Sequence, residues 1–122
     1  MADFKKLRVW HHARALALHA HRVAGRIRGS PYASLRSQMI RAAMSIQANI
    51  VEGRSQQSER EFSRFLRDAL ASTSELECHL IMARDFEVIT ENDFQSLLSD
   101  VVEVRKMLHG LLDRLSASSG KR

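Results

Sequence analysis

Six histidines and a single cysteine are the side chains of this 122-residue chain best suited to metal binding or covalent catalysis. His79 follows Glu75 by four residues, so the two side chains would share one face of a helix. A stable metal site needs ligands from a second helix, and the Glu-x-x-His repeats of di-iron bundles do not occur. We therefore expect no metal and no cofactor. The four histidines between residues 11 and 21 are interpreted as surface residues.

Motifs of nucleophilic or phosphate chemistry are equally sparse. The chain has neither a glycine-rich phosphate loop nor the Gly-x-Ser-x-Gly turn of serine hydrolases, and Cys78 has no histidine at motif spacing. A free thiol on a helix is usually inert. The single cysteine also excludes an internal disulfide and fits a reducing cytosol. We predict a protein without catalytic residues, and not an enzyme.

Arginine is the residue that most clearly indicates a function. Nineteen Lys and Arg residues face fourteen Asp and Glu, a formal net charge of +5, and fifteen of the nineteen are Arg. Residues 1–60 carry eleven basic and three acidic side chains, whereas residues 61–122 carry eight and eleven. Arg makes planar, bidentate contacts with phosphate and carboxylate groups, so a basic face that meets an acidic partner is one interpretation. The other is a soluble protein that happens to be basic.

Four segments with apolar residues three and four positions apart predict the helices that must position these side chains. We expect them over about 8–28, 34–52, 58–86 and 90–115. The residues expected in the core are Val9, Ala13, Leu16, Ala20, Val23 and Ile27; Leu35, Met39, Ala42, Ala43, Ile46 and Ile50; Phe62, Leu66, Ala69, Thr73, Leu76, Leu80 and Ala83; and Phe94, Leu97, Val101, Val104, Leu108, Leu111 and Leu115.

Local signals mark the ends of these helices. The Gly-Ser-Pro run at 29–31 ends the first, and Gly53 is expected as a left-handed cap of the second. Ser58, followed three residues later by Glu61, is a capping-box pattern at the start of the third. Thr90 is expected to cap the fourth.

Four long helices with short connections favour an all-α fold, an up-down-up-down antiparallel four-helix bundle. We expect a single domain over 1–115 and a flexible, polar and basic tail over 116–122. No apolar run is long enough for a secretory signal or a membrane span, so we expect a soluble cytoplasmic protein.

The second helix carries more apolar surface than a lone bundle needs. A second stripe of Ile40, Met44 and Val51 lies beside its core stripe, and Trp10 and Leu18 lie off the main stripe of the first helix. A contiguous apolar patch usually marks a partner surface. We therefore predict that these five residues form the interface of a homo-oligomer. A wide bundle core is the alternative.

Basic side chains collect at one end of such a bundle, where the first helix starts, the second meets the third, and the fourth ends. A further row, which includes Arg22 and Arg26, follows the first helix. Such surfaces can track a phosphate backbone. The alternative is a solvated face with local salt bridges to Glu59, Glu61 and Asp68. The basic end holds Lys5, Lys6, Arg8, Arg54, Arg60, Arg64, Arg67, Arg114, Lys121 and Arg122; the predicted nucleic-acid-binding residues are Arg8, Arg22, Arg26, Arg54, Arg60, Arg64 and Arg67.

Two polar residues near the second connection are given a structural role. Asn49 borders the core stripe and needs a hydrogen-bond partner, either a backbone carbonyl or a neighbouring helix. Glu52 is close in sequence to Arg54, and our hypothesis is that it pairs with Arg54, with Arg64 or with a neighbouring subunit.

Three stretches, "LRVWHHARALAL", "SQMIRAAMSIQANIVEG" and "EFSRFLRDALASTSELECHL", resemble the four-helix-bundle family known as the 23S rRNA-intervening sequence proteins, over residues 4–115. The resemblance implies a small bundle that assembles into a homopentameric barrel. The chain is also similar, more distantly, to the accessory protein of diversity-generating retroelements, a basic pentamer that binds a reverse transcriptase and nucleic acid. The family often has Pro where this chain has Gln47. The matching positions are Leu7, Val9 and Trp10; Arg41, Ala42, Ser45, Ile46, Asn49, Ile50, Glu52 and Gly53; and Glu61, Phe62, Arg64, Phe65, Leu66, Ala69, Ser72, Glu75, Leu76 and Glu77.

Charge, apolar surface and resemblance together predict a non-enzymatic, oligomeric bundle whose basic surface binds RNA or DNA, or a nucleic-acid-processing partner such as a reverse transcriptase. The alternative is a protein–protein interaction scaffold that does not bind nucleic acid. The two differ in whether the arginines meet phosphate or only solvent.

Overall fold

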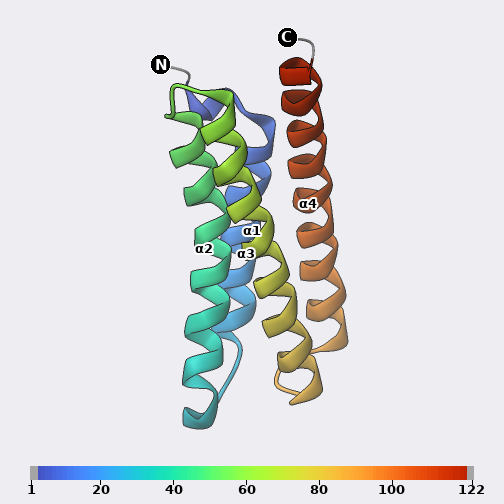
Figure 1. Cartoon of the computed structure of the whole chain (residues 1–122). Helices are drawn as coiled ribbons and strands as arrows, with labels where there is room; N and C mark the ends of the chain where they lie inside the picture. Colours follow the sequence, from blue (N-terminus) through green and yellow to red (C-terminus); the bar gives the residue numbers. More distant parts are fainter. Residues whose placement is uncertain (1–2, 121–122) are drawn as a thin grey trace.

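The structure, a computed structural model, describes residues 3–120 and contains four long α-helices, two short 3-10 helices and no strand within that range. Figure 1 shows the long helices lying side by side in a bundle. Their bounds are α1 (Arg8–Gly25), α2 (Ala33–Arg54), α3 (Glu59–Asp85) and α4 (Glu91–Gly120), and the 3-10 helices are η1 (Phe4–Lys6) and η2 (Ser30–Tyr32).

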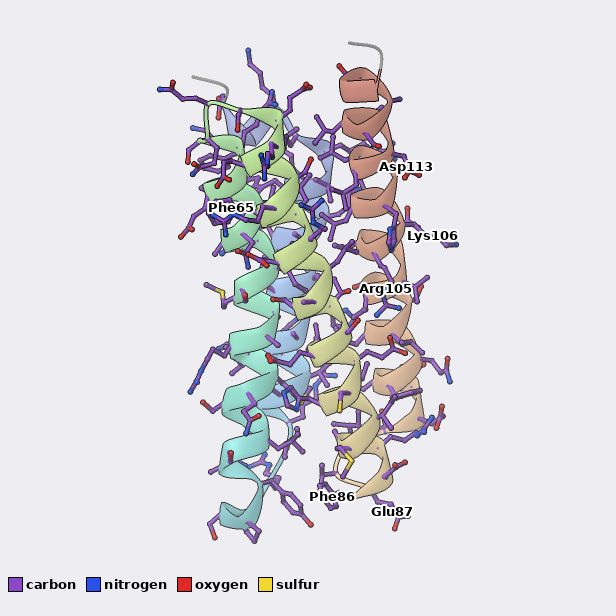
Figure 2. All side chains as sticks on the ribbon, in the orientation of Figure 1. Phe65, Phe86, Glu87, Arg105, Lys106 and Asp113 are labelled. Atoms are coloured by element: carbon purple, nitrogen blue, oxygen red, sulfur yellow. The ribbon has the colours of Figure 1, made fainter. Side chains whose placement is uncertain are left out.

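Each long helix packs against two neighbours. The contacting pairs are α1 with α2, α2 with α3, α3 with α4, and α4 with α1, and the contact between α2 and α3 is the most extensive. The start of α1, the α2–α3 connection and the end of α4 lie at one end of the bundle, and the other two connections lie at the opposite end (Figure 1). Figure 2 places Phe65, Lys106 and Asp113 toward the first end and Phe86 and Glu87 at the second.

The core is formed by the predicted stripes. All the expected residues of the first and third stripes are buried, and so are all but Leu35 in the second and Leu111 and Leu115 in the fourth. Those three are partly buried against the same cluster. Among residues 3–118, Thr73 is the one buried residue with a polar side chain; its hydroxyl donates to the Leu70 carbonyl at 2.7 Å. The helical spacing therefore identified the core correctly.

Capping was predicted well at two helix starts. The Ser58 hydroxyl accepts a hydrogen bond from the Glu61 amide at 3.1 Å, and the Thr90 hydroxyl accepts one from the Asp93 amide at 3.0 Å. The first helix ends earlier than expected, at Gly25 rather than near 28.

Glycine 29 turns the chain between α1 and α2. It adopts the left-handed φ of 100°, which strongly favours glycine. The Arg36 guanidinium donates to the carbonyls of Ile27 and Gly29 at 3.1 and 2.9 Å. One side chain thus satisfies two carbonyls just after the end of α1.

Gly53 does not have the predicted role. The helix α2 continues through it to Arg54, so it is not a left-handed cap. A Cβ atom at this position would lie 2.8 Å from the Phe65 Cβ and 2.9 Å from the Phe62 Cδ1. Glycine is therefore needed because the end of α2 approaches the start of α3 too closely for any side chain.

The fourth helix also extends further than expected. It continues through Ser116 to Gly120, into the segment for which a flexible tail was expected. Lys121 and Arg122, the basic end of that segment, lie outside the described residues.

Four polar contacts hold α4 to its neighbours. Asp100 is 2.7 Å from the Nδ1 of His19, and Asp93 accepts from Arg26 at 2.7 Å, which joins α4 to α1. Arg105 donates to Glu77 at 2.6 Å and to the Thr73 hydroxyl at 3.3 Å, which joins it to α3. Because each contact joins a particular residue of α4 to a particular residue of a neighbouring element, these contacts help to fix the position of α4 along the bundle axis.

Replacing Gly53 by Ala is expected to lower the free energy of unfolding by about 1–3 kcal/mol, because the added methyl group has no room. Urea denaturation measures it. Gly25→Ala is the matched control: nothing lies within 4 Å of a Cβ there, so its stability should be equal to or higher than that of the parent protein. Equal stabilities of the two variants would contradict the close approach.

Candidate nucleic-acid and subunit interfaces

The basic end holds six exposed cations without an ion-pair partner among residues 3–120. They come from η1, the start of α1, the first nine residues of α3 and the last third of α4, and they are Lys5, Lys6, Arg8, Arg60, Arg67 and Arg114. Asp3, Glu52 and Asp113 are the carboxylates there that likewise lack an ion pair. When Arg54, Arg64, Glu59, Glu61 and Asp68 are counted as well, eight cations face six acids among the described residues of this end, a positive excess of two.

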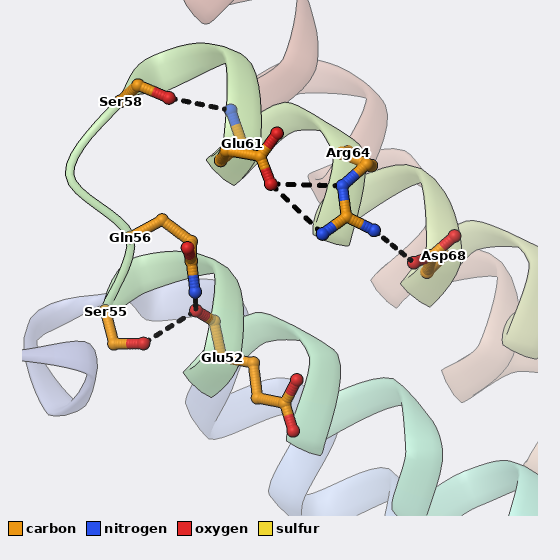
Figure 3. Close-up of polar contacts among 7 residues, drawn as sticks. All are labelled: Glu52, Ser55, Gln56, Ser58, Glu61, Arg64 and Asp68. Atoms are coloured by element: carbon orange, nitrogen blue, oxygen red, sulfur yellow. Dashed lines mark hydrogen bonds and ion pairs between the residues drawn. The ribbon is translucent and has the colours of Figure 1, made fainter.

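Arg64, which is predicted to bind nucleic acid, pairs with two acids of its own helix. Its Nε and Nη2 donate to one oxygen of Glu61 at 3.1 and 3.0 Å, and its Nη1 lies 4.0 Å from Asp68 (Figure 3). Its guanidinium also lies 4.5 Å from the centre of the Phe65 ring. Here the local salt-bridge alternative describes the contacts, and Arg64 is less available to a phosphate than Arg60 or Arg67.

Arg54 is half-buried at the α2–α3 connection. Its Nε has no hydrogen-bond partner among the described residues, and its guanidinium lies 5.7 Å from the centre of the Phe62 ring. This side chain packs on the corner and presents less of its charge to solvent than its exposed neighbours do.

Arg22 lies in the last turn of α1 and Arg26 is its C-cap residue, whereas the basic end lies at the start of that helix. Arg8 and Arg26 are about 27 Å apart along α1 at 1.5 Å per residue. Arg26 is paired with Asp93, whereas Arg22 is exposed without an ion pair in the described range. The seven predicted arginines therefore do not form one patch: Arg8, Arg60 and Arg67 remain as exposed, unpaired members at the basic end.

The predicted oligomer-interface residues come together more completely. Trp10 and Leu18 from α1 and Ile40 and Met44 from α2 line one open groove of about 330 Å³ between the two helices. Leu18 and Met44 are 50% and 49% exposed, large fractions for side chains of this size. Val51 is half-buried on α2 and is not part of the groove lining.

Four further residues line this groove that the sequence reasoning did not place there: Arg14, Ala17, His21 and Gln47. The first three follow Trp10 at intervals of four, seven and eleven residues, so a helical wheel centred on Trp10 would have found them. Gln47 accepts a hydrogen bond from the Trp10 indole nitrogen at 3.3 Å. The Phe4 ring packs edge-on to the indole, with 4.9 Å between centroids.

Asn49 links its own helix to the next through serine hydroxyls. Its amide nitrogen donates to the Ser45 carbonyl at 2.9 Å and lies 3.1 Å from the Ser45 hydroxyl. That hydroxyl is 2.8 Å from the hydroxyl of Ser72 on α3. This half-buried network helps to position α2 against α3.

The Glu52 side chain makes no ion pair with Arg54 or Arg64, contrary to that part of our hypothesis. Arg64 binds other acids, and Figure 3 shows the Glu52 carboxylate directed away from it. The Glu52 carbonyl, by contrast, accepts from the Ser55 hydroxyl at 2.7 Å and from the Gln56 amide at 3.0 Å. Glu52 therefore contributes to the corner through its backbone.

Residues 3–120 contain no cluster of three or more His, Cys, Asp or Glu side chains able to hold a metal ion. Cys78 is exposed and unpaired. Within the same described range, the helices are too short or too polar to cross a bilayer.

An all-α bundle with an apolar groove on one side and a basic end is the class of protein that these features define. A family model described as 23S rRNA-intervening sequence protein matches residues 5–110, and the chain belongs to that family. The chain is also similar to a crystal structure of a protein with unknown function from the S23 ribosomal protein family of Bacteroides thetaiotaomicron. The two are 26% identical with a TM-score of 0.79, over 85% of this chain and 97% of that chain. No curated protein matches it.

The Ser45–Ser72 contact predicts a measurable coupling between α2 and α3. In a double-mutant cycle of Ser45→Ala and Ser72→Ala, urea denaturation should give an interaction energy of about 0.5–1.5 kcal/mol. A control cycle uses the exposed serines of the same two helices, Ser37→Ala and Ser74→Ala, and should give a value near zero. Equal couplings in the two cycles would show that the hydroxyl contact contributes nothing specific.

Proposed function

We propose that this protein is a non-enzymatic, self-assembling four-helix bundle that binds RNA or DNA through its basic end. The observation that carries the proposal is the gathering of exposed cations without ion-pair partners at that end, from the four elements η1, α1, α3 and α4. We propose nucleic acid inside the cell as the ligand and the cytoplasm as the location.

Phosphate is the group that this surface suits. Arg8, Arg60 and Arg67 offer forked guanidinium groups with no internal carboxylate to satisfy them, and such groups bind phosphate oxygens bidentately. The aromatic side chains at this end are buried, as Phe62 is, or partly buried, as Phe4, Trp10 and Phe65 are, which leaves few ring faces on which bases could stack. Binding would therefore follow the backbone and depend little on sequence. Its affinity would then fall steeply with salt concentration.

Self-association is supported by the groove between α1 and α2. Leu18 and Met44 leave about half of their surface in water, which favours covering them with another subunit. We propose an up-down-up-down antiparallel course of the helices and a homopentameric ring, the arrangement that the family resemblance implies. A ring repeats the basic end in every subunit, so that weak phosphate contacts add up through avidity. A reverse transcriptase or similar enzyme could use the same surface as a partner.

Charge reversal at the basic end should strongly weaken the binding of nucleic acid. Arg60→Glu with Arg67→Glu is expected to weaken binding of a fluorescent RNA by more than about tenfold at low salt, because two cations become anions at the proposed contact. Fluorescence anisotropy at two salt concentrations measures it, and circular dichroism checks that helicity is unchanged.

The matched control is Arg28→Glu with Arg41→Glu, which changes the formal charge equally on exposed residues without ion pairs elsewhere. It should retain most of the binding. Equal losses in the two double variants would mean that only net charge matters. No binding by the parent protein at low salt would leave the interaction scaffold as the function.

Met44→Asp should dissociate the oligomer, because it places a charge in the apolar groove while disturbing little of the bundle core. Sedimentation velocity or light scattering at micromolar concentration measures the mass. Met82→Asp is the control, since Met82 is 38% exposed on α3 and does not line the groove. A parent protein that sediments as a monomer would refute the subunit interface.

A further inference from the structure

A second pocket lies between the start of α1 and the last part of α4, away from the α1–α2 groove. It has a volume of about 320 Å³, and its apolar side is formed by Leu7 and Val9 from one segment and Met107 and Leu111 from the other. Arg8, Lys106 and Arg114 complete its lining. A volume near 300 Å³ is at the lower end of the range for small-molecule sites.

The three cations of this pocket are exposed and have no ion-pair partner among residues 3–120. The acids of α4 nearest in sequence do not neutralise them. Glu103 lines a different depression, beside His12 and Asp100, and Asp113 makes no ion pair in the described range. Three cations from two helices thus border one concave site without compensation.

Gly110 keeps the pocket open. It lies within α4, where glycine costs about 1 kcal/mol relative to alanine, and no left-handed φ requires it. A Cβ built there would lie 3.8 Å from an Nη atom of Arg114, so the Arg114 guanidinium extends back over the glycine. The missing side chain leaves room beneath a charged group.

The start of α1 adds to the positive potential. Its N-cap is Leu7, which supplies no side-chain hydrogen bond, and the first turn contains no acidic residue. The partial positive charge of the helix N-terminus is therefore not offset locally. It supplements the three side chains, which carry most of the attraction.

We propose that this pocket binds the phosphate monoester of a nucleotide, with the base or sugar against the apolar side. A phosphate monoester carries about −1.5 to −2 charges near pH 7, whereas a backbone diester carries one, so three cations that line one pocket favour the monoester. The ligand can be a free mononucleotide or the 5′-phosphorylated end of a strand. Binding of the strand end extends the proposed function and rests on it, whereas binding of a free mononucleotide is independent of that function.

The experiment compares three probes on the parent protein: a short 5′-phosphorylated oligonucleotide, the same oligonucleotide with a 5′-hydroxyl, and free adenosine monophosphate. Anisotropy measures the oligonucleotides and calorimetry the mononucleotide. We expect the phosphorylated end to bind about tenfold more tightly than the hydroxyl end, the scale of a charge-assisted contact.

Gly110→Leu fills the pocket and should remove the preference, whereas Gly110→Ala, with only ordinary contacts at its Cβ, should keep it. Lys106→Gln provides a second test on an exposed residue if the leucine variant does not fold. A preference for the phosphorylated end without mononucleotide binding identifies the strand end as the ligand; mononucleotide binding without that preference identifies the free nucleotide.

Equal binding of both oligonucleotides with no mononucleotide binding would overturn the pocket while leaving the proposed function intact. Mononucleotide binding that is lost in Gly110→Leu, with no oligonucleotide bound at all, would support the pocket and refute the nucleic-acid proposal.

Discussion

The close packing of α2 against α3 is the contact on which the rest of the structure depends. At Gly53 the two helices come so near that a methyl group does not fit, and further along the bundle the hydroxyls of Ser45 and Ser72 meet at 2.8 Å. Interiors packed this tightly do not shift by small amounts. The α2–α3 connection that follows Gly53 is therefore fixed in place. The first turns of α3 are fixed with it, and they carry Arg60 and Arg67, the two α3 cations of the basic end.

The apolar groove and the basic end both arise because only part of each helix surface is buried in the core. The helix α2 buries one stripe in the core and still presents Ile40 and Met44 beside Leu18 of α1, which leaves a groove. Charges are divided in a similar way. Along the bundle, acids satisfy arginines across helices, as Asp93 does for Arg26 and Glu77 for Arg105. At the basic end the cations are left without such partners, and surface positions of this kind are free to bind phosphate.

Sequence periodicity predicted the core almost completely, because burial in a bundle repeats every three to four residues and each stripe is local. It also brought Trp10, Leu18, Ile40 and Met44 to one surface. Periodicity did not predict features that depend on contacts between different helices. Asp93, the ion-pair partner of Arg26, is 67 positions away, so the local sequence pattern did not indicate that the charge of Arg26 is paired. Gly53 looked like a cap because its steric neighbours, Phe62 and Phe65, belong to the next helix. The pocket around Gly110 joins residues about one hundred positions apart.

The central claim is that nucleic acid meets this protein at the basic end, and chemical footprinting of cationic side chains tests it most directly. Lysine- and arginine-specific reagents, with and without RNA at low salt, report which side chains become protected in the complex. We predict protection of the six exposed, unpaired cations of the basic end, Lys5, Lys6, Arg8, Arg60, Arg67 and Arg114. Arg28 and Arg41 should react as they do in the free protein. Protection spread evenly over all exposed cations, or none at any of them, would contradict the account.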